Sequence, residues 1–511
     1  MTVTQAEVDA CVARLELGGA AASRACDGRA WVDGRRVAAK SGLWIESSNP
    51  ATGKVVARVA GCDTADVDAA VAAARRAFDA GQWSRYPSVR KEALLRLAAL
   101  IEENALELAV LDCVEGGKPV ADNLSGDLPA SVSCFKYHAE AIDKLFGQVT
   151  ATDPGSMALV VREPLGVCGL IVPWNFPLLM AAWKLAPALA TGNCVVLKPS
   201  ELTSLSALRV AELAQAAGVP DGVLNVVPGY GATCGSAMSA HADIDMIGFT
   251  GSTAVGKLVL KASAESNLKR VSLELGGKSP QIVFCDAEDL DKVAGHVMAA
   301  AFWNGGENCS CGSRLLVQKG CKEELLKRLV AKAAPGGDWT VGDPLRLSSK
   351  VGSMITKAHA QKVLGYIAKG RAEGGKVICG GERVLAETGG DFVPITIFDS
   401  MRNDMTLCQE EIFGPVLSVI EFETEEEAIR IANKTMYGLA ASVYTSNLNR
   451  ATRVSRKLRA GTVSINCFSE GNDATPFGGF KASGFAGRDK SVHAHDAYTE
   501  LKTIWYEVDD A

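Results

Sequence analysis

The sequence predicts an α/β fold in which two units, each built on a parallel sheet, follow one another along the chain. The main sign is a series of short, continuously apolar runs separated by polar or alanine-rich stretches of helical length. Strands that are apolar along their whole length belong to sheets with helices on both faces, and such sheets are typically parallel. The pattern reaches residue 275 and then starts again, which predicts the second unit.

Two helices are predicted before the first apolar run. Asp63 is placed to cap the first of them. The apolar side chains of this helix fall on one face: Val67, Val71, Ala74 and Phe78. Residues 91–114 predict a second, longer helix, which ends at the glycine pair Gly116-Gly117.

The apolar runs that follow predict the strands. In the first unit they end at Val172, Leu197, Val227, Thr250 and Leu275. In the second unit, runs that end at Phe284 and Gln318 are each followed by a predicted helix. These helices start at about Asp286 and at Lys322. Residues 498–508 alternate like a half-exposed strand, which needs a sheet edge to pair with, such as that of a partner subunit.

Composition indicates an ordinary soluble globular protein. The 511 residues are 48% hydrophobic and 22% charged, so the chain can bury a large core without disulfides or metals. A net charge of −6 gives no electrostatic reason to expect nucleic acid or an anionic membrane as partner.

Cysteine usage and the N-terminus favour a cytoplasmic location. The 15 cysteines are scattered, without a CxxC pair, as expected for reduced thiols. The first residues lack a basic segment and an apolar core, and Glu7 and Asp9 also argue against a signal peptide. Residues 164–183 are uncharged but contain Pro173 and Pro177, which favours a buried strand, a turn and a helix over a membrane span.

Two glycine-containing stretches are candidates for phosphate binding. Residues 251–257, "GSTAVGK", nearly match a Walker loop, but Leu258 follows where a magnesium-binding hydroxyl is needed, so an NTPase is disfavoured. The backbone N–H groups and the Ser252 hydroxyl could still hold a phosphate at a helix N-terminus. Residues 229–235 lack a true GxGxxG, and a tight turn from strand to helix accounts for either stretch equally well.

Lys198 and Glu201 follow the end of a predicted strand, where α/β sheets bind ligands. Both side chains could reach a ribose, and the carboxylate would repel a 2′-phosphate. A solvated loop with a helix cap at Ser200 is the plainer alternative, and these residues alone favour it modestly.

Residues 306–314, "GENCSCGSR", carry Cys309 and Cys311. Two cysteines without nearby ligands are too few for a metal clip, and a disulfide between them would be strained. Cys309 lies in a glycine-rich turn that allows close approach, as a nucleophile requires, while a buried core thiol remains the alternative.

Glu274 and Asn175 could complete such a site. A carboxylate at the end of an apolar strand should have a raised pKa, as a general base needs. An amide fixed between prolines suits an oxyanion hole. The alternatives are an exposed Glu274 paired with Lys278, and a turn asparagine.

The wording and order of several blocks resemble the aldehyde dehydrogenase superfamily over residues 48–505. The blocks are "VPWNFP", "LKPSE", "GFTGST", "LELGGKSP", "GENCSCGSR", "EEIFGPV" and "PFGGFKASG". The resemblance implies a Rossmann-like NAD-binding domain (residues 1–143 and 165–276) and an α/β catalytic domain (277–482). It also implies an oligomerisation segment that forms a small hairpin (144–164 and 491–511), and a homo-oligomer, dimer or homotetramer.

The resemblance also assigns roles to residues. Cys309 matches the nucleophile, with Cys311 as a neighbour. Glu274 matches the base and Asn175 the oxyanion donor, while Lys184 matches a lysine near the active site with a less settled role. The implied cofactor is NAD, with NADP weaker, and no metal is expected. The implied cofactor contacts are Val172, Pro173, Trp174, Lys198, Ser200, Glu201, Gly231, Gly251, Ser252, Gly256, Leu275, Glu411 and Phe413.

The implied reaction turns an aldehyde into a carboxylate through a Cys309 thiohemiacetal and thioester. The presence of Glu274 favours hydrolysis over transfer to CoA. It also argues against a structural protein on the same fold, which would be expected to lose Cys309 or Glu274.

The substrate is predicted from the C-terminal part of the chain. Residues 487–505 and the "DLP" at 127–129 resemble bacterial γ-glutamyl-aminobutyraldehyde and guanidinobutyraldehyde dehydrogenases of polyamine breakdown. The hypothesis is an ω-amino or γ-glutamylamino butyraldehyde; a broad aliphatic or aromatic specificity is the alternative. Asp127 and Asp473 would steer a cationic tail, unless both are solvated surface groups. The predicted apolar walls are Phe176, Trp183, Phe468 and Phe477.

Overall fold

The structure, a computed structural model, describes residues 3–18, 24–334 and 336–508. An eight-stranded sheet forms its first layer, in the order β19-β11-β10-β7-β8-β9-β1-β2. The five central strands are parallel: β7 (Val167–Ile171), β8 (Cys194–Lys198), β9 (Leu224–Val226), β10 (Met246–Thr250) and β11 (Arg270–Glu274). The predicted runs therefore form strands of one parallel sheet.

The edges of this sheet differ from the prediction of a purely parallel sheet. Three short edge strands are antiparallel: β1 (Ala30–Val32), β2 (Arg35–Val37) and β19 (Gly484–Phe485). β19 comes from the C-terminal part of the chain and pairs with β11 through Glu274 and Gly484. A segment from the C-terminal part of the chain thus completes the edge beside the strand that carries the predicted base.

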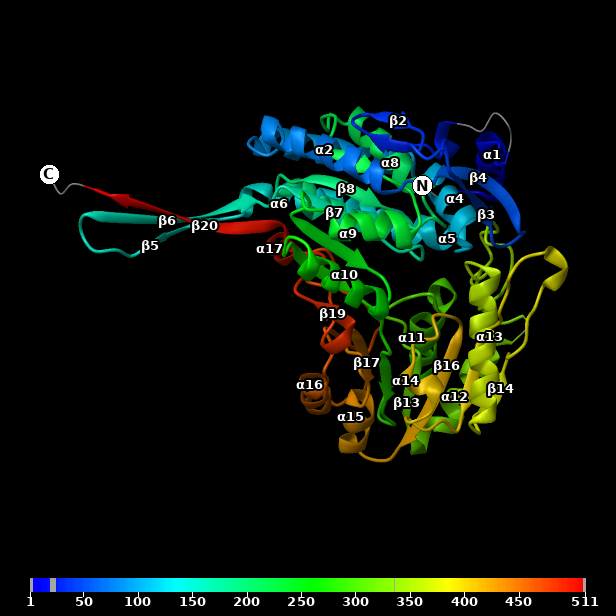
Figure 1. The fold of residues 1–511 in the computed structure, drawn as a ribbon. Coiled ribbons are helices and arrows are strands. Elements are labelled where there is room, and N and C mark those ends of the chain that lie inside the picture. The colour runs from blue at the N-terminus through cyan, green and yellow to red at the C-terminus, as the bar shows by residue number, and fades with distance from the viewer. Residues whose placement is uncertain (1–2, 19–23, 335, 509–511) are drawn as a thin grey trace.

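Helices from the first half of the chain cover this sheet (Figure 1). They are α1 (Gln5–Leu15), α2 (Thr64–Ala80), α3 (Pro87–Glu103), α4 (Ala105–Gly116), α6 (Leu128–Ala141), α7 (Pro177–Ala190), α8 (Leu205–Ala216), α9 (Ser236–Ala240) and α10 (Thr253–Glu265). Asp63 caps α2 by accepting from the Ala65 N–H, as predicted. An antiparallel pair, β3 (Trp44–Asn49) and β4 (Lys54–Ala60), lies beside α4.

The single helix predicted over residues 91–114 is wrong. The chain forms two helices, α3 and α4, which meet at Asn104. The Asn104 side chain donates to the Leu100 carbonyl at 2.7 Å, and its own φ of −102° and ψ of 17° leave the helical region. Asparagine competes for backbone hydrogen bonds in this way, so it ends one helix and starts the next.

The second sheet has seven strands in the order β14-β15-β16-β13-β12-β17-β18. All are parallel except β14 at the edge: β12 (Pro280–Val283), β13 (Arg314–Gln318), β14 (Lys376–Cys379), β15 (Thr396–Asp399), β16 (Val416–Phe422), β17 (Ala440–Tyr444) and β18 (Thr462–Ile465). Its helices include α11 (Leu290–Phe302), α12 (Lys322–Ala333), α13 (Lys357–Ala372), α15 (Glu425–Asn433) and α16 (Leu448–Lys457). α11 begins after its cap Asp289, slightly later than predicted.

A three-stranded arm projects from the body (Figure 1). β20 (Thr499–Glu507) pairs along its whole length with β6 (Ser156–Pro164), and β5 (Gln148–Thr150) pairs with the other edge of β6. The predicted final strand therefore exists and finds its sheet within this chain. Val149, Leu501 and Trp505 on this arm are 74%, 60% and 64% exposed, more than an isolated arm would favour.

Within the described part of the chain, no helix is long and apolar enough to cross a membrane. The uncharged run at 164–183 forms β7, a turn and the first half of α7, as predicted.

Candidate active site

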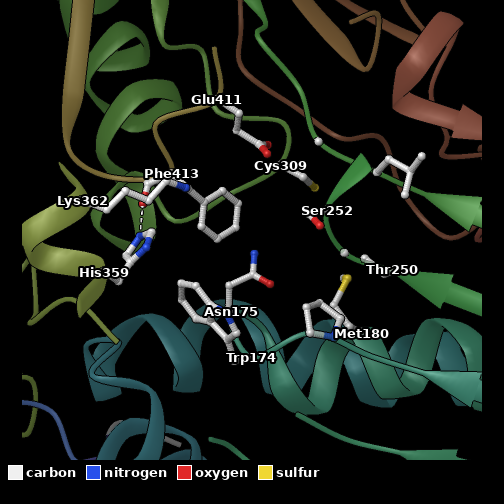
Figure 2. Close-up of a pocket in the computed structure, with 14 residues that line it drawn as sticks. Trp174, Asn175, Met180, Thr250, Ser252, Cys309, His359, Lys362, Glu411 and Phe413 are labelled. Carbon is white, nitrogen blue, oxygen red and sulfur yellow. Dashed lines mark hydrogen bonds between the residues drawn. The ribbon is translucent and has the colours of Figure 1, made fainter. Parts of the chain in front are cut away.

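A cleft with a volume of about 230 Å³ opens where both sheets contribute loops (Figure 2). Its lining includes nine residues predicted from the sequence: Pro173, Trp174, Asn175, Gly251, Ser252, Leu275, Cys309, Glu411 and Phe413. Sequence reasoning missed the other five: Met180, Thr250, Gly276, His359 and Lys362. The cysteine and the cofactor-type residues thus share one cavity.

The loop before Cys309 is tightly folded. Asn304, Gly305 and Gly306 take consecutive left-handed conformations, with φ of 53°, 60° and 70°. At Gly306 a Cβ would lie 2.3 Å from the Gly414 carbonyl oxygen, so only glycine fits. These turns explain why the sequence is glycine-rich here, and they leave the Cys309 side chain half-buried in the cleft.

Asn175 is fixed beside this loop. Its amide donates to the Glu307 carbonyl at 2.9 Å, and the Asn304 amide donates to the Asn175 carbonyl at 2.7 Å. A side-chain amide has two N–H donors, so the second can point at a ligand. In Figure 2 the Asn175 amide and the Cys309 sulfur point into the same space. This arrangement suits an oxyanion hole.

The two cysteines occupy different environments. Burial, followed by the charges of Glu470, Glu411 and Glu274, raises the pKa of the Cys309 thiol well above its ordinary value. Cys309 therefore needs a proton acceptor to become a thiolate. The buried Cys311 thiol contacts the Ala301 carbonyl at 3.3 Å and does not line the cleft.

Glu274 ends β11 but lies outside the cleft lining. It is 3% exposed, and among the described residues neither carboxylate oxygen has a hydrogen-bond partner. Burial, followed by the Asp489 charge, raises its pKa well above the ordinary value, while Lys184 and Arg488 oppose the shift. The alternative of an exposed glutamate paired with Lys278 is therefore wrong.

Lys184 lies in the core beneath the cleft, on α7. Its ammonium forms a buried ion pair with Asp489 at 2.9 Å. Both charges act on Glu274, in opposite directions. Lys184, Asp489 and Glu274 form one buried charged cluster.

Lys198 and Glu201 lie at the carboxyl end of β8, outside the cleft lining. The Lys198 ammonium donates to the Pro199 carbonyl at 2.8 Å and lies 3.5 Å from the Glu201 carboxylate. Glu201 remains partly exposed and can accept from a ligand hydroxyl. Ser200 is buried and does not cap α8, which begins after Ser204.

The turn after β10 carries the Walker-like stretch. The Ser252 hydroxyl caps α10 by accepting from the Val255 N–H at 3.3 Å. Gly256 packs against Leu275, where a Cβ would lie 2.7 Å from a leucine methyl carbon. Gly231, further along the sheet edge, faces open space. Free N–H groups at the start of α10 suit a phosphate.

Glu411 and Phe413 form the opposite wall. Glu411 accepts from the Gly277 N–H at 2.9 Å, and a Cβ on Gly276 would come within 2.4 Å of its carboxylate. Phe413 has a φ of 59°, and its ring meets Trp174 edge-on at 5.3 Å. This wall is preformed.

His359, which the sequence did not single out, joins this wall to the cysteine loop. Its Nε2 lies 2.6 Å from the Phe413 carbonyl and 3.6 Å from the Glu307 carboxylate. Its position on α13 with Lys362, one turn apart, is the only local signal that could have found it.

The prediction that Asp127 steers substrate at the tunnel mouth is wrong. Asp127 is fully buried, and its carboxylate accepts from Lys118 at 2.6 Å. The Lys118 ammonium in turn lies 4.1 Å from the ring centroid of Phe176 and 4.6 Å from that of Trp303. Because Lys118 neutralises its charge inside the core, Asp127 does not attract a cationic ligand. The alternative, that Asp127 is a solvated surface group, is wrong as well.

The remaining predicted substrate residues surround the other side of the cysteine loop. Trp183 packs on Phe477 at 5.1 Å, Phe468 is half-buried, and Asp473 is half-buried with a hydrogen bond from Ser133. The structure adds Glu470, which accepts from the hydroxyl of Ser310 next to the cysteine.

Lys490 completes this aromatic side. Its ammonium lies 5.0 Å from the Trp183 ring and donates to the Glu470 carbonyl at 2.8 Å. After burial, the negative charge of Glu470 contributes to the raised pKa of the Cys309 thiol.

A cysteine thiol and a fixed amide donor in one cleft define an enzyme that attacks its substrate with a cysteine nucleophile. The chain belongs to the aldehyde dehydrogenase family, whose model matches residues 37–504. It is 52% identical over 497 residues to aminoacetaldehyde dehydrogenase of Pseudomonas aeruginosa, covering 97% of this chain and 99% of the relative.

Two solved structures support the same assignment. The indole-3-acetaldehyde dehydrogenase AldA of P. syringae, a mutant in complex with NAD+ and IAA, matches with a TM-score of 0.95 and 49% identity, covering 99% of this chain and 100% of that one. The γ-glutamyl-γ-aminobutyraldehyde dehydrogenase of Burkholderia cenocepacia matches with a TM-score of 0.94 and 50% identity, with the same coverage. The protein is an NAD-dependent aldehyde dehydrogenase with an aldehyde as substrate.

Proposed function

We propose that the aldehyde is oxidised by NAD while it is held as a covalent thiohemiacetal, and then a thioester, on Cys309. The observation that carries this is the shared cavity of the Cys309 thiol and the fixed Asn175 amide. Attack of the thiolate on the aldehyde carbon gives a thiohemiacetal, whose oxyanion is held by the Asn175 amide and the Cys309 N–H. The thiohemiacetal carbon would lose its hydride to NAD held in the crevice, which leaves a thioester on Cys309. Glu274 then takes a proton from the water that hydrolyses the thioester.

The residues of the crevice fit a dinucleotide. The partly exposed Glu201 carboxylate can accept from ribose hydroxyls, and the start of α10 offers N–H donors to a pyrophosphate. Glu411, held by the Gly277 N–H, supplies a second ribose acceptor on the opposite wall. Lys198, Ser200 and the remaining predicted contacts complete the proposed NAD site.

Glu201→Gln is expected to shift cofactor choice toward NADP. The substitution removes a charge that repels a 2′-phosphate and weakens a charged hydrogen bond to the ribose. We expect the ratio of kcat/KM for NADP to that for NAD to rise about tenfold. Steady-state NADH and NADPH formation measures it, with the exposed Glu265→Gln as control. An unchanged ratio would mean that Glu201 does not face the ribose.

We propose an ω-amino or γ-glutamylamino butyraldehyde of polyamine catabolism as substrate. Glu470 and Asp473 place negative charge beside the cysteine loop and the Trp183–Phe477 wall, which suits an apolar chain with a cationic end. Relatives named for aminoacetaldehyde and γ-glutamyl-γ-aminobutyraldehyde agree with this. A relative of similar identity is named for indole-3-acetaldehyde, so an aromatic aldehyde is the competing substrate.

A panel of aldehydes with NAD tests the substrate class. We expect 4-aminobutanal and its γ-glutamyl form to exceed benzaldehyde and indole-3-acetaldehyde in kcat/KM. If the kcat/KM of an aromatic aldehyde is higher by about tenfold or more, a difference of about 1.4 kcal/mol, the polyamine proposal is wrong. NAD-dependent turnover of any aldehyde would still be consistent with the thioester mechanism, so the two proposals can fail separately.

Glu470→Gln is expected to reduce selectivity for a cationic substrate. Glutamine keeps an acceptor for the Ser310 hydroxyl but removes the charge. The kcat/KM for 4-aminobutanal should fall about tenfold relative to that for propanal. Asp473→Asn is the matched comparison, since Asp473 is the carboxylate that the sequence singled out. An equal loss for both aldehydes would show that Glu470 serves only the reaction centre.

We further propose that the β5-β6-β20 arm mediates homo-oligomer formation, as a dimer or tetramer. Its exposed apolar side chains support this. The predicted domain boundaries and the cytoplasmic location stay predictions.

A further inference from the structure

Two cysteines meet beyond the carboxyl ends of β12 and β13, which are the opposite ends of these strands from the cleft lining. Cys285 follows β12, and Cys321 follows β13 immediately before α12. The Cys285 sulfur lies 3.7 Å from the Gln318 carbonyl oxygen, and the Cys321 sulfur lies 3.3 Å from the same oxygen. Both thiols therefore converge on one acceptor.

The backbone between them allows close approach. A Cβ on Gly320 would lie 3.0 Å from the Cys285 sulfur, so a larger residue would press on this thiol. The Gln318 side chain also accepts from the Cys285 N–H at 2.9 Å. This bond holds the turn after β12 next to the end of β13. Burial and a hydrogen bond with Cys285 raise the pKa of the Cys321 thiol to about 12. The two thiols are direct neighbours.

We propose that Cys285 and Cys321 are a site of reversible disulfide formation. Of the chain's 15 cysteines, Cys285 alone is exposed, so an oxidant in solution reaches it first. Cys321 is buried directly behind it and is placed to resolve the oxidised sulfur.

Hydrogen peroxide is the oxidant class. The Cys285 thiolate attacks one peroxide oxygen, the O–O bond breaks, and sulfenic acid and hydroxide form. The Cys321 sulfur then attacks the Cys285 sulfur, the S–S bond forms, and the sulfenic oxygen leaves as hydroxide. The two thiol protons convert both hydroxides to water. A small dithiol restores both thiols by exchange.

The crosslink would hold the segment that carries the nucleophile. Residues 286–320 include α11, the cysteine loop with Cys309, and β13. Closing this segment into a loop restricts the unfolded chain and so stabilises the folded one. Cys309 itself takes no part, because the bond forms at the opposite ends of β12 and β13 from the cleft.

Peptide mapping of the full-length protein without reduction tests the proposal. After mild peroxide, we expect a peptide pair joined through Cys285 and Cys321 that separates on treatment with dithiothreitol. Cys285→Ser should abolish the pair, and Cys379→Ser, a half-buried cysteine on β14, should leave it. In Cys321→Ser, Cys285 should stay as sulfenic acid that dimedone labels.

A second measurement does not depend on the variants folding equally well. The thermal midpoint of the unaltered protein should rise by about 2–4 °C after oxidation and return after reduction. Cys285 oxidised to sulfinic or sulfonic acid, a Cys285 bond between two chains, or no linked pair would each overturn the proposal.

Discussion

Replacing Cys309 by alanine is expected to abolish aldehyde oxidation while NAD still binds. Without the thiol there is no covalent intermediate, and the Asn175 amide has no oxyanion to hold. Losing a nucleophile of this kind costs on the order of 10⁴-fold or more in kcat. NADH absorbance with propanal and NAD measures turnover, and quenching of protein fluorescence by NAD shows that the crevice remains intact.

The matched control for this prediction is Cys311→Ala. Cys311 lies only two positions after Cys309, but its thiol contacts the Ala301 carbonyl and lies outside the cleft lining. We expect the Cys311 variant to keep its kcat/KM near that of the parent protein. Turnover that survives in Cys309→Ala, or is lost in both variants alike, would remove Cys309 from the role of nucleophile.

The sequence predicted the elements whose signals are local. Continuous apolar runs gave the central strands, and the Asp63 cap gave the start of α2. The break at Asn104 was missed, because the apolar pattern continues across it while the asparagine side chain turns back to Leu100. Helical periodicity does not register such a local competition.

Site residues whose contacts lie far away in the sequence were harder to predict. Glu470 meets Ser310 across 160 positions, and His359 meets Phe413 across 54. No spacing rule connects such pairs. The prediction for Asp127 failed for another reason: Lys118 is only nine positions away, but the sequence does not reveal that both side chains are buried and paired in the core. The base lies at a strand end, the amide in a proline-framed turn and the cysteine in a glycine-rich turn, and the family resemblance singled them out.

Glu274→Gln is expected to stop the reaction at the thioester. Hydride transfer precedes hydrolysis, so the variant should release a burst of about one NADH per active site and then nearly stall. Loss of a general base lowers steady-state kcat about 10²–10⁴-fold. Glutamine has nearly the size of the buried glutamate side chain, so the fold should hold. Rapid-mixing absorbance measures the burst, and mass spectrometry measures the acyl group on the protein. A steady rate without a burst, or CoA-dependent turnover, would contradict the role of Glu274.

The pH dependence of hydrolysis follows from the same carboxyl. Burial and the Asp489 charge raise the Glu274 pKa, so the ionised form that acts as base becomes populated only at higher pH. Steady-state kcat, where hydrolysis limits it, should therefore rise with pH through this raised pKa. Asp489→Asn removes a negative charge and leaves Lys184 unpaired, and both changes favour the ionised carboxylate. The rising limb should then move to lower pH. A limb that moves to higher pH would show that Asp489 lowers the Glu274 pKa, opposite to its effect in this structure.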